Sequence, residues 1–201
     1  GKFSFTAVKR GVFTSALFNL EKGMLLGYRG PYGKGFSLVK NKRVCIIAGG
    51  IGIAALCLLY HQLTKDNNVT LIYGAKNKQG LVLNEILNEN FENIVKEHSH
   101  QNKLCLCTDD GSSGKKAFTT KLFEEMLKTE KFDIVYTCGP EIMMKCVVDL
   151  CAKYNITCEA SLERMMSCGF GICGKCAINH KLVCLDGPVF NAEELKKLKD
   201  F

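Results

Sequence analysis

From residue 43 onward, apolar runs of strand length alternate with segments whose apolar residues recur at helical spacing. Strands are expected over residues 43–49, 68–76, 103–111 and 132–140, and residues 156–163 follow the last helix. Helices are expected over residues 49–65 (after a tight turn), 81–91, 117–131 and 141–155. Strands that alternate with helices form right-handed crossovers, so this part of the chain predicts a parallel sheet covered by helices on both faces.

The two ends of the chain have a different texture. Residues 1–36 alternate apolar and polar positions in short runs and end in the turn-rich segment GYRGPYGKGF, which predicts the last strands of an antiparallel β unit. From Met165 the chain is rich in cysteine and glycine and closes in a small helix that Asn191 would cap together with Glu194. The predicted fold class is therefore α/β in three parts, over residues 1–40, 41–160 and 161–201.

The composition is that of an ordinary globular protein: 201 residues, 47% apolar and 23% charged, with a net charge of +7. The lysines are scattered among acids and form no basic stripe with aromatic residues, which argues against nucleic-acid binding. The charge favours a solvated surface, an acidic partner or an anionic dinucleotide. The apolar run over residues 44–60 is broken by glycines, so we interpret it as buried strand, turn and helix and expect no membrane association.

Twelve cysteines is a high number for this length, and many lie inside apolar runs, where a free cysteine behaves as a small hydrophobe. A secreted disulfide scaffold would be shorter and would carry a signal peptide. We therefore expect a reducing, cytoplasmic location. The chain also opens on a strand-like alternation without an initiator Met, and we expect further barrel strands to precede residue 1.

The first strand of the sheet runs into a glycine-rich turn, AGGIGIAAL, that opens the first helix. Gly49, Gly50 and Gly52 would let backbone N–H groups approach a pyrophosphate at the helix N-terminus, where the helix dipole favours negative charge. The match to the G-x-G-x-x-G fingerprint is incomplete because Ala55 stands at its third glycine. The alternative is a tight turn that needs glycine for packing alone.

The fourth strand ends in a second turn, TCGPE, which contains Cys138, Gly139 and Pro140. Taken alone, such a turn only ends a strand and begins a helix. The carboxyl ends of parallel strands meet at one edge of the sheet, so we expect both turns to contact a dinucleotide there. The segment DDGSSGKKA lacks the Walker spacing, which excludes a P-loop triphosphatase, but it would border the same crevice.

Four cysteines crowd into the C-terminal stretch SCGFGICGKCAINHKLVC, with the spacing C-x4-C-x2-C-x7-C: Cys168, Cys173, Cys176 and Cys184. The plant-type 2Fe-2S pattern is C-x4-C-x2-C with a fourth cysteine further on. A structural zinc site would show two C-x2-C pairs or a mixture with histidine. Glycines between the cysteines would let the backbone approach bridging sulfides, so we predict a 2Fe-2S cluster, with His180 as an alternative ligand.

An iron–sulfur cluster passes single electrons, whereas a nicotinamide gives up two as hydride. A protein that holds both needs a group that converts one into the other, and a flavin is the common choice. The N-terminal 36 residues are where the flavin is expected.

The segments RGPYGKGF, AGGIGIAAL, TDDGS, YTCGPEIMM and ASLERMMSCGFGICGKCA, with VCLDGPVF, resemble the electron-transfer subunits of type B dihydroorotate dehydrogenases, in the ferredoxin–NADP reductase superfamily. The resemblance covers nearly the whole chain. It implies a partial FAD-binding β-barrel over residues 1–40, a Rossmann-like NAD-binding domain over 41–160 and a 2Fe-2S module over 161–201. Electrons would pass between NAD(H), FAD and the cluster, to or from an FMN-containing catalytic subunit in a heterotetramer of pyrimidine biosynthesis.

Residue by residue, the resemblance makes the four motif cysteines the cluster ligands. It also places the flavin at the strand FSFTAV, with Phe5 and Thr6, and at the turn GVFTSAL, with Phe13 and Thr14. Phe13 stands where the family has a glycine before the threonine. The choice of NADH over NADPH rests on the resemblance alone, because the second strand is followed by Lys76 and Lys78 instead of an acid.

Other functions remain open on the sequence. The small subunits of NADH-dependent ferredoxin:NADP oxidoreductases and sulfide dehydrogenases resemble the chain in its nucleotide part, but they tend to carry Asp at the position of Cys168. The diaphorase subunit of a hydrogenase is a further alternative. A flavin-less metal-binding scaffold and a zinc-stabilised regulatory module are the non-catalytic alternatives.

Overall fold

The computed structural model describes residues 5–82 and 102–201, which form two compact units, Gly1–Pro31 and Tyr32–Phe201. Most of the helix expected over residues 81–91 lies outside the described residues. Each unit has its own organisation. The second unit contains both the sheet and the cysteine-rich tail.

The first unit contains one helix, α1 (Val12–Phe18). The threonine hydroxyl oxygen of Thr14 accepts hydrogen bonds from the backbone N–H groups of Arg10 and Gly11, at 2.8 and 2.9 Å, and so closes the first turn of the helix. The antiparallel strands expected over residues 1–36 are not formed in the described residues 5–36, and this expectation is corrected. A strand needs a neighbour to satisfy its N–H and C=O groups, and no strand is present among residues 5–42.

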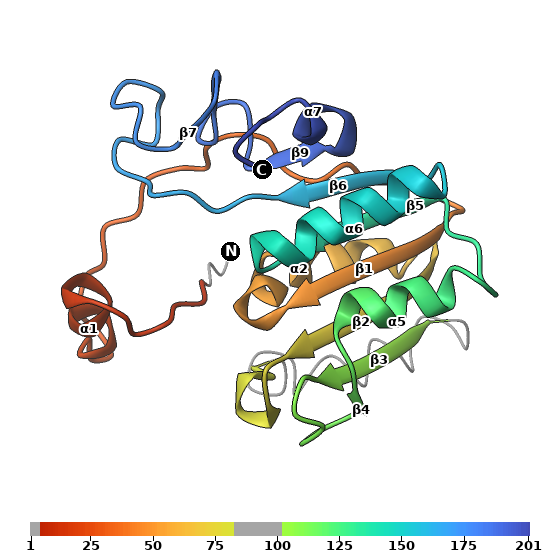
Figure 1. The fold of residues 1–201 in the computed structure, drawn as a ribbon. Helices are drawn as coiled ribbons and strands as arrows, with labels where there is room; N and C mark the ends of the chain where they lie inside the picture. Colours follow the sequence, from red (N-terminus) through yellow and green to blue (C-terminus); the bar gives the residue numbers. More distant parts are fainter. Residues whose placement is uncertain (1–4, 83–101) are drawn as a thin grey trace. The chain divides into compact units, whose positions relative to one another are not determined.

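The second unit is built on a seven-stranded sheet with the order β4-β3-β2-β1-β5-β6-β9 (Figure 1). The strands are β1 (Arg43–Gly49), β2 (Asn68–Ala75), β3 (Lys103–Thr108), β4 (Lys115–Lys116), β5 (Ile134–Cys138), β6 (Thr157–Ser161) and β9 (Val189–Asn191). All neighbours are parallel except β6 and β9. The predicted parallel α/β sheet is therefore confirmed, and the strands β4, β6 and β9 are additions to it.

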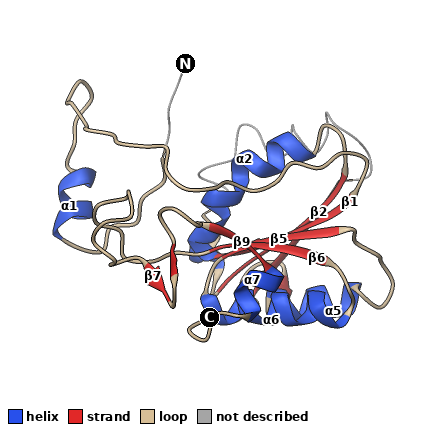
Figure 2. Cartoon of the chain, turned by 90° about the horizontal axis from the view of Figure 1, so that it is seen from above, coloured by secondary structure: helices blue, strands red, loops and turns tan. Residues whose placement is uncertain are grey.

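Helices cover both faces of this sheet, as Figure 2 shows. The helix α2 (Ile53–Leu63) lies on one face, and α5 (Thr119–Met126), α6 (Glu141–Lys153) and α7 (Ala192–Lys196) lie on the other. The continuous apolar run of β1 is explained by this sandwich, because Val44, Ile46 and Ala48 pack toward α2 while Cys45 and Ile47 pack toward α5 and α6.

Two short 3-10 helices, η1 (Gly50–Gly52) and η2 (Lys78–Gly80), and a small hairpin of β7 (Ala177–Ile178) and β8 (Lys181–Leu182) complete the unit. The predicted cap of the last helix is present: the side chain of Asn191 accepts from the backbone N–H of Glu194 at 2.9 Å. Across residues 5–82 and 102–201, no helix has both the length and the apolar character that a membrane span requires.

Residues 32–40 lead into the unit and are hydrogen-bonded to the turn before β9 and to β5 and β6. Lys34 donates its backbone N–H to the carbonyl oxygen of Gly187, and the phenol of Tyr136 donates to the carbonyl oxygen of Ser37 at 2.8 Å. The carboxylate of Glu159 accepts both the N–H and the hydroxyl of Ser37, at 3.0 and 2.7 Å. These bonds fix the start of the unit against β5 and β6.

Candidate functional site

The glycine-rich turn lies where the sheet changes direction. From β1 the chain proceeds through α2 to β2 and β3 on one side, and later returns to β5 on the other side of β1. Helices that leave neighbouring strands toward opposite faces open a crevice at the carboxyl ends of those strands, which is where open α/β sheets bind ligands. The turns Gly49–Gly52 and Cys138–Pro140 border this crevice.

Each glycine of the turn has its own structural reason. A Cβ atom on Gly52 would lie 2.5 Å from the carbonyl oxygen of Cys138, so the β1–α2 turn packs directly on the β5 turn. Gly139 has a φ of 153°, and a Cβ there would lie 2.9 Å from the Cα of Gly49. Gly50 differs: its φ is 53°, and a Cβ would meet no atom within 4 Å. The position therefore faces open space and leaves room for a ligand.

The start of α2 offers its backbone to an anion. No side chain caps the helix, or the 3-10 turn that leads into it, so the first N–H groups have no partner of that kind. Such N–H groups, with the positive end of the helix dipole, favour a phosphate group. Burial raises the pKa of the Cys138 thiol to about 12, so this side chain is neutral at pH 7 and contributes shape to the crevice instead of charge.

The four motif cysteines are arranged as two pairs. In the first, the backbone N–H of Cys173 donates to the sulfur of Cys168 at 3.4 Å. The N–H groups of Cys173, Phe170 and Ile172 together lower the pKa of the Cys168 thiol to about 6. Backbone donors around a thiolate are what a cluster ligand requires.

The second pair is buried at the base of the small hairpin. Cys176 and Cys184 are 3% and 2% exposed. The hairpin joins them, because Val183 donates its N–H to the carbonyl oxygen of Cys176 at 3.2 Å. Burial, and then the Cys176 thiol, raise the pKa of Cys184, so binding of a metal there would release protons.

Positive φ angles shape the loop between these pairs. Gly169, Gly171 and Gly174 have φ of 82°, 85° and 71°, a region that glycine adopts without strain. Side chains at the first two would clash with Tyr32 and Leu185, whereas Gly174 faces open space. The backbone at Gly174 is therefore open to an approaching group.

The spacing of the four cysteines is that of a binuclear cluster. Two pairs of thiols can each hold one iron, as the C-x4-C-x2-C spacing suggests. In the described residues, the four sulfurs do not form a metal-ligating group of three or more, so the cluster assignment rests on the spacing and on the two pairs. His180, the alternative ligand, is exposed in the turn between β7 and β8.

An ion pair that the sequence did not indicate connects the nucleotide turn to the cysteine loop. The guanidinium of Arg164 donates to both carboxylate oxygens of Glu141, at 3.0 and 2.9 Å. Glu141 directly follows the Cys138–Pro140 turn, and Arg164 lies just ahead of the loop that begins at Ser167. Since β6 is parallel to β5, the chain also leaves the sheet at the same carboxyl edge.

Family models match the two regions of the chain that contain these residues. Residues 46–149 match the oxidoreductase NAD-binding domain family, and residues 163–196 match the iron-sulfur cluster binding domain of dihydroorotate dehydrogenase B. The chain is 42% identical, over its whole length and 74% of the relative, to a protein of Methanocaldococcus jannaschii named "Probable dihydroorotate dehydrogenase B (NAD(+)), electron transfer subunit". A protein of the same name from Pyrococcus horikoshii is 47% identical over 94% of this chain and 70% of its own.

The chain belongs to the family of dihydroorotate dehydrogenase B electron transfer subunits. Among solved structures, it resembles a chain of NADH-dependent reduced ferredoxin-NADP oxidoreductase with a TM-score of 0.77 and 28% identity, over 98% of this chain and 71% of that one. Flavohemoglobin from Malassezia yamatoensis shares the fold, with a TM-score of 0.57 and 20% identity over 76% of this chain and 40% of its own. The two relatives named for dihydroorotate dehydrogenase B are more similar to this chain in sequence than either of these solved structures.

The flavin residues implied by this family lie in the first unit. Phe5 and Phe13 are 53% and 74% exposed, and Thr6 is exposed as well. The hydroxyl oxygen of Thr14 is used as the cap of α1. A flavin could stack on the aromatic side chains, and the role of all four residues stays a prediction.

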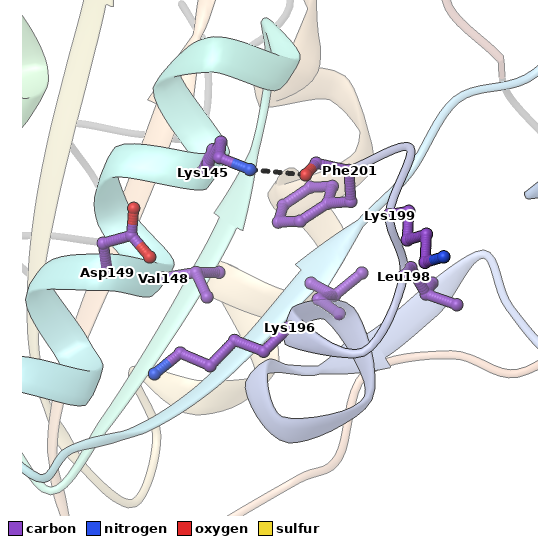
Figure 3. Close-up of a pocket in the computed structure, with 8 residues that line it drawn as sticks. Lys145, Val148, Asp149, Lys196, Leu198, Lys199 and Phe201 are labelled. Atoms are coloured by element: carbon purple, nitrogen blue, oxygen red, sulfur yellow. Dashed lines mark hydrogen bonds between the residues drawn. The ribbon is translucent and has the colours of Figure 1, made fainter.

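A cavity of about 280 Å³ between α6 and α7 is a separate feature (Figure 3). Lys145 donates to the carbonyl oxygen of Phe201 at 2.6 Å across it, and Lys196 and Lys199 contribute further positive charge. Neither the glycine turns nor the motif cysteines line this cavity.

Proposed function

We propose that the chain is the electron-transfer subunit that passes electrons between NAD(H), FAD and a 2Fe-2S cluster, to or from a catalytic dihydroorotate dehydrogenase subunit in pyrimidine biosynthesis. The observation that carries the proposal is an open glycine turn at the carboxyl edge of the sheet, together with two cysteine pairs in the segment that leaves the sheet at the same edge after β6. When bound, FAD supplies the conversion between hydride and single electrons, and the cluster supplies a one-electron carrier.

The residues of the chain have defined roles in this proposal. Backbone N–H groups at Gly50–Gly52 bind the pyrophosphate of NAD(H), while the Cys138–Pro140 turn forms the opposite wall. The pairs Cys168–Cys173 and Cys176–Cys184 each hold one iron. The cluster fits because four sulfurs, loop glycines with positive φ and backbone donors to the Cys168 sulfur occur together. Phe5, Thr6, Phe13 and Thr14 contact FAD.

The three functional parts follow from these roles. We assign residues 1–40 to the flavin-binding part, 41–160 to the NAD-binding domain and 161–201 to the cluster module. We also propose a reducing, cytoplasmic location, because many of the twelve cysteines lie inside apolar runs and none of them is in a disulfide.

The catalytic partner docks at the cysteine loop. Met165, Met166, Ile172 and Leu185 surround the loop and are 73%, 50%, 80% and 50% exposed. Exposed apolar residues of this kind mark protein interfaces, and single-electron transfer requires a short distance to the acceptor. We propose that the partner carries FMN and that two copies of each subunit form a heterotetramer, which the mass of the purified complex tests directly.

The first experiment measures iron, acid-labile sulfide, flavin and the visible spectrum of the anaerobically purified protein. Two irons and two sulfides per chain are expected for this cluster. Cys173→Ser is expected to lose the cluster spectrum, while Cys146→Ser, at an exposed cysteine of α6, serves as the matched control. A Cys173→Ser protein with an unchanged spectrum would contradict the ligand assignment.

The second experiment separates this function from its alternatives. With its catalytic subunit, the protein is expected to reduce NAD in the presence of dihydroorotate. A protein that contains zinc and no labile sulfide would support a regulatory module, and a cluster-bearing protein that never oxidises NADH would support a scaffold.

A further inference from the structure

The carboxyl end of β2 carries two lysines where NAD-binding sheets commonly have an acid. Gly74 of β2 pairs in register with Gly49 of β1, so Lys76 lies just beyond the sheet edge, one strand away from the glycine turn. Neighbouring strands are about 4.8 Å apart. Residues 76–80 read KNKQG and contain no acidic side chain that could bind the 2′-hydroxyl of an adenosine ribose.

Both lysines are exposed, and neither ammonium group has an ion-pair partner in the part of the chain that the structure describes. Other lysines of this region differ in this respect. Lys115 pairs with Glu125 at 2.6 Å, and Lys103 pairs with Glu130 at 3.0 Å. The charges of Lys76 and Lys78 are therefore available to a ligand.

The neighbouring loop fixes the backbone that carries these lysines. The N–H of Lys78 donates to the hydroxyl of Ser112 at 2.8 Å, and the N–H of Asp110 donates to the carbonyl oxygen of Lys76 at 3.3 Å. The carboxylate of Asp110 turns back on its own loop, where it accepts the N–H of Ser112 at 2.8 Å. Asp109 is the exposed acid that remains at this edge, and its charge opposes binding of an anion.

We propose that Lys76 and Lys78 form a subsite for the 2′-phosphate of NADP(H), so that this chain binds the phosphorylated dinucleotide in addition to NAD(H). The inference rests on the proposed function, because it extends the same nucleotide crevice. Each ammonium acts as a point charge toward the phosphate, and the attraction is screened by salt. The 2′-phosphate lies on the adenosine ribose and takes no part in hydride transfer.

The test uses the intact, cofactor-loaded protein and compares two inhibitors of NADH-dependent reduction of an artificial acceptor. The compounds 5′-AMP and 2′,5′-ADP differ only in the 2′-phosphate. We expect 2′,5′-ADP to inhibit at a concentration about tenfold lower at low salt, with the ratio falling as salt is added. The double variant Lys76→Ala/Lys78→Ala is expected to bring the ratio close to one.

Two further variants sharpen the result. Lys131→Ala removes a lysine ahead of β5, at the opposite edge of the sheet, and is expected to keep the wild-type ratio. Asp109→Asn removes the opposing charge and is expected to increase the ratio. Equal inhibition by the two compounds in the wild-type protein would overturn the 2′-phosphate subsite and leave NAD binding intact. Failure of NADH to reduce any acceptor would instead contradict the proposed function itself.

Discussion

Two glycines of the β1–α2 turn offer a sharp test of how the nucleotide crevice is built. Gly52 has a φ of −58° and a ψ of −20°, which alanine adopts without strain. An added methyl group at this position would nevertheless lie 2.5, 2.6 and 2.7 Å from three backbone atoms of Cys138 and Gly139. Gly50 has the opposite character, with open space around it and a φ of 53°.

These contacts set the expected magnitudes. An ordinary contact at a Cβ begins near 3.4 Å, so Gly52→Ala must separate the two turns by nearly an ångström. Backbone atoms cannot rotate away, so we expect a loss near the upper end for overpacking, about 3 kcal/mol in the free energy of unfolding. Gly50→Ala meets no atom and is expected to cost about 1 kcal/mol, from its left-handed backbone alone.

The assay combines urea unfolding, followed by circular dichroism, with the Michaelis constant for NADH. Gly50→Ala is expected to raise the KM for NADH about tenfold, a loss of about 1.4 kcal/mol in binding, because its methyl group occupies the space left for the pyrophosphate. A Gly52→Ala protein as stable as the wild type would refute the direct packing of the two turns. An unchanged KM in a folded Gly50→Ala protein would place the nucleotide elsewhere.

Three more predictions concern the second unit. Thr137→Val is expected to raise the free energy of unfolding by about 1 kcal/mol in a urea titration, because the buried hydroxyl of Thr137 has no hydrogen-bond partner among the residues that the structure describes. Arg43 lowers the pKa of Asp133 to about 2, so Asp133→Asn should cost stability at pH 7 and progressively less as the pH falls from about 4 toward 2. Arg164→Ala should raise the KM for NADH by leaving the Glu141 carboxylate unpaired beside the nucleotide turn, and Glu141→Gln in the same protein should restore it. The first argument is contradicted if Thr137→Val and the wild type have the same free energy of unfolding. The second is contradicted if the stability lost in Asp133→Asn does not change with pH. The third is contradicted if Glu141→Gln does not restore the KM for NADH.

The sheet was predictable because its signals are local. The strand expected over residues 43–49 coincides with β1, since a continuous apolar run of that length between a charged residue and glycine is typical of a buried parallel strand. The cap of α7 was predictable for the same reason, because Asn191 and Glu194 are only three positions apart. The candidate glycines and cysteines likewise depend on short spacings.

Features that depend on distant residues could not be predicted in this way. Charge alone does not reveal that Arg164 pairs with Glu141. Nor does it reveal that Glu159 accepts a hydrogen bond from Ser37, more than a hundred residues away in the sequence. The prediction of strands near the N-terminus was wrong for a related reason. Alternation shows which face of a strand would be buried, but it does not supply the neighbouring strand that makes it stable.

The antiparallel pairing of β9 with β6 has a consequence for how the cysteine loop is anchored. Ser161 and Val189 are partners in the ladder, so the chain leaves the sheet and returns to it at adjacent positions. The segment between them is a loop, and both of its ends are held by the same pair of strands. The conformational entropy lost when this loop closes is offset by the strand pairing and not by metal binding. A loop that has lost its cluster therefore keeps both ends in place. We expect a new cluster to assemble in it without refolding of the sheet.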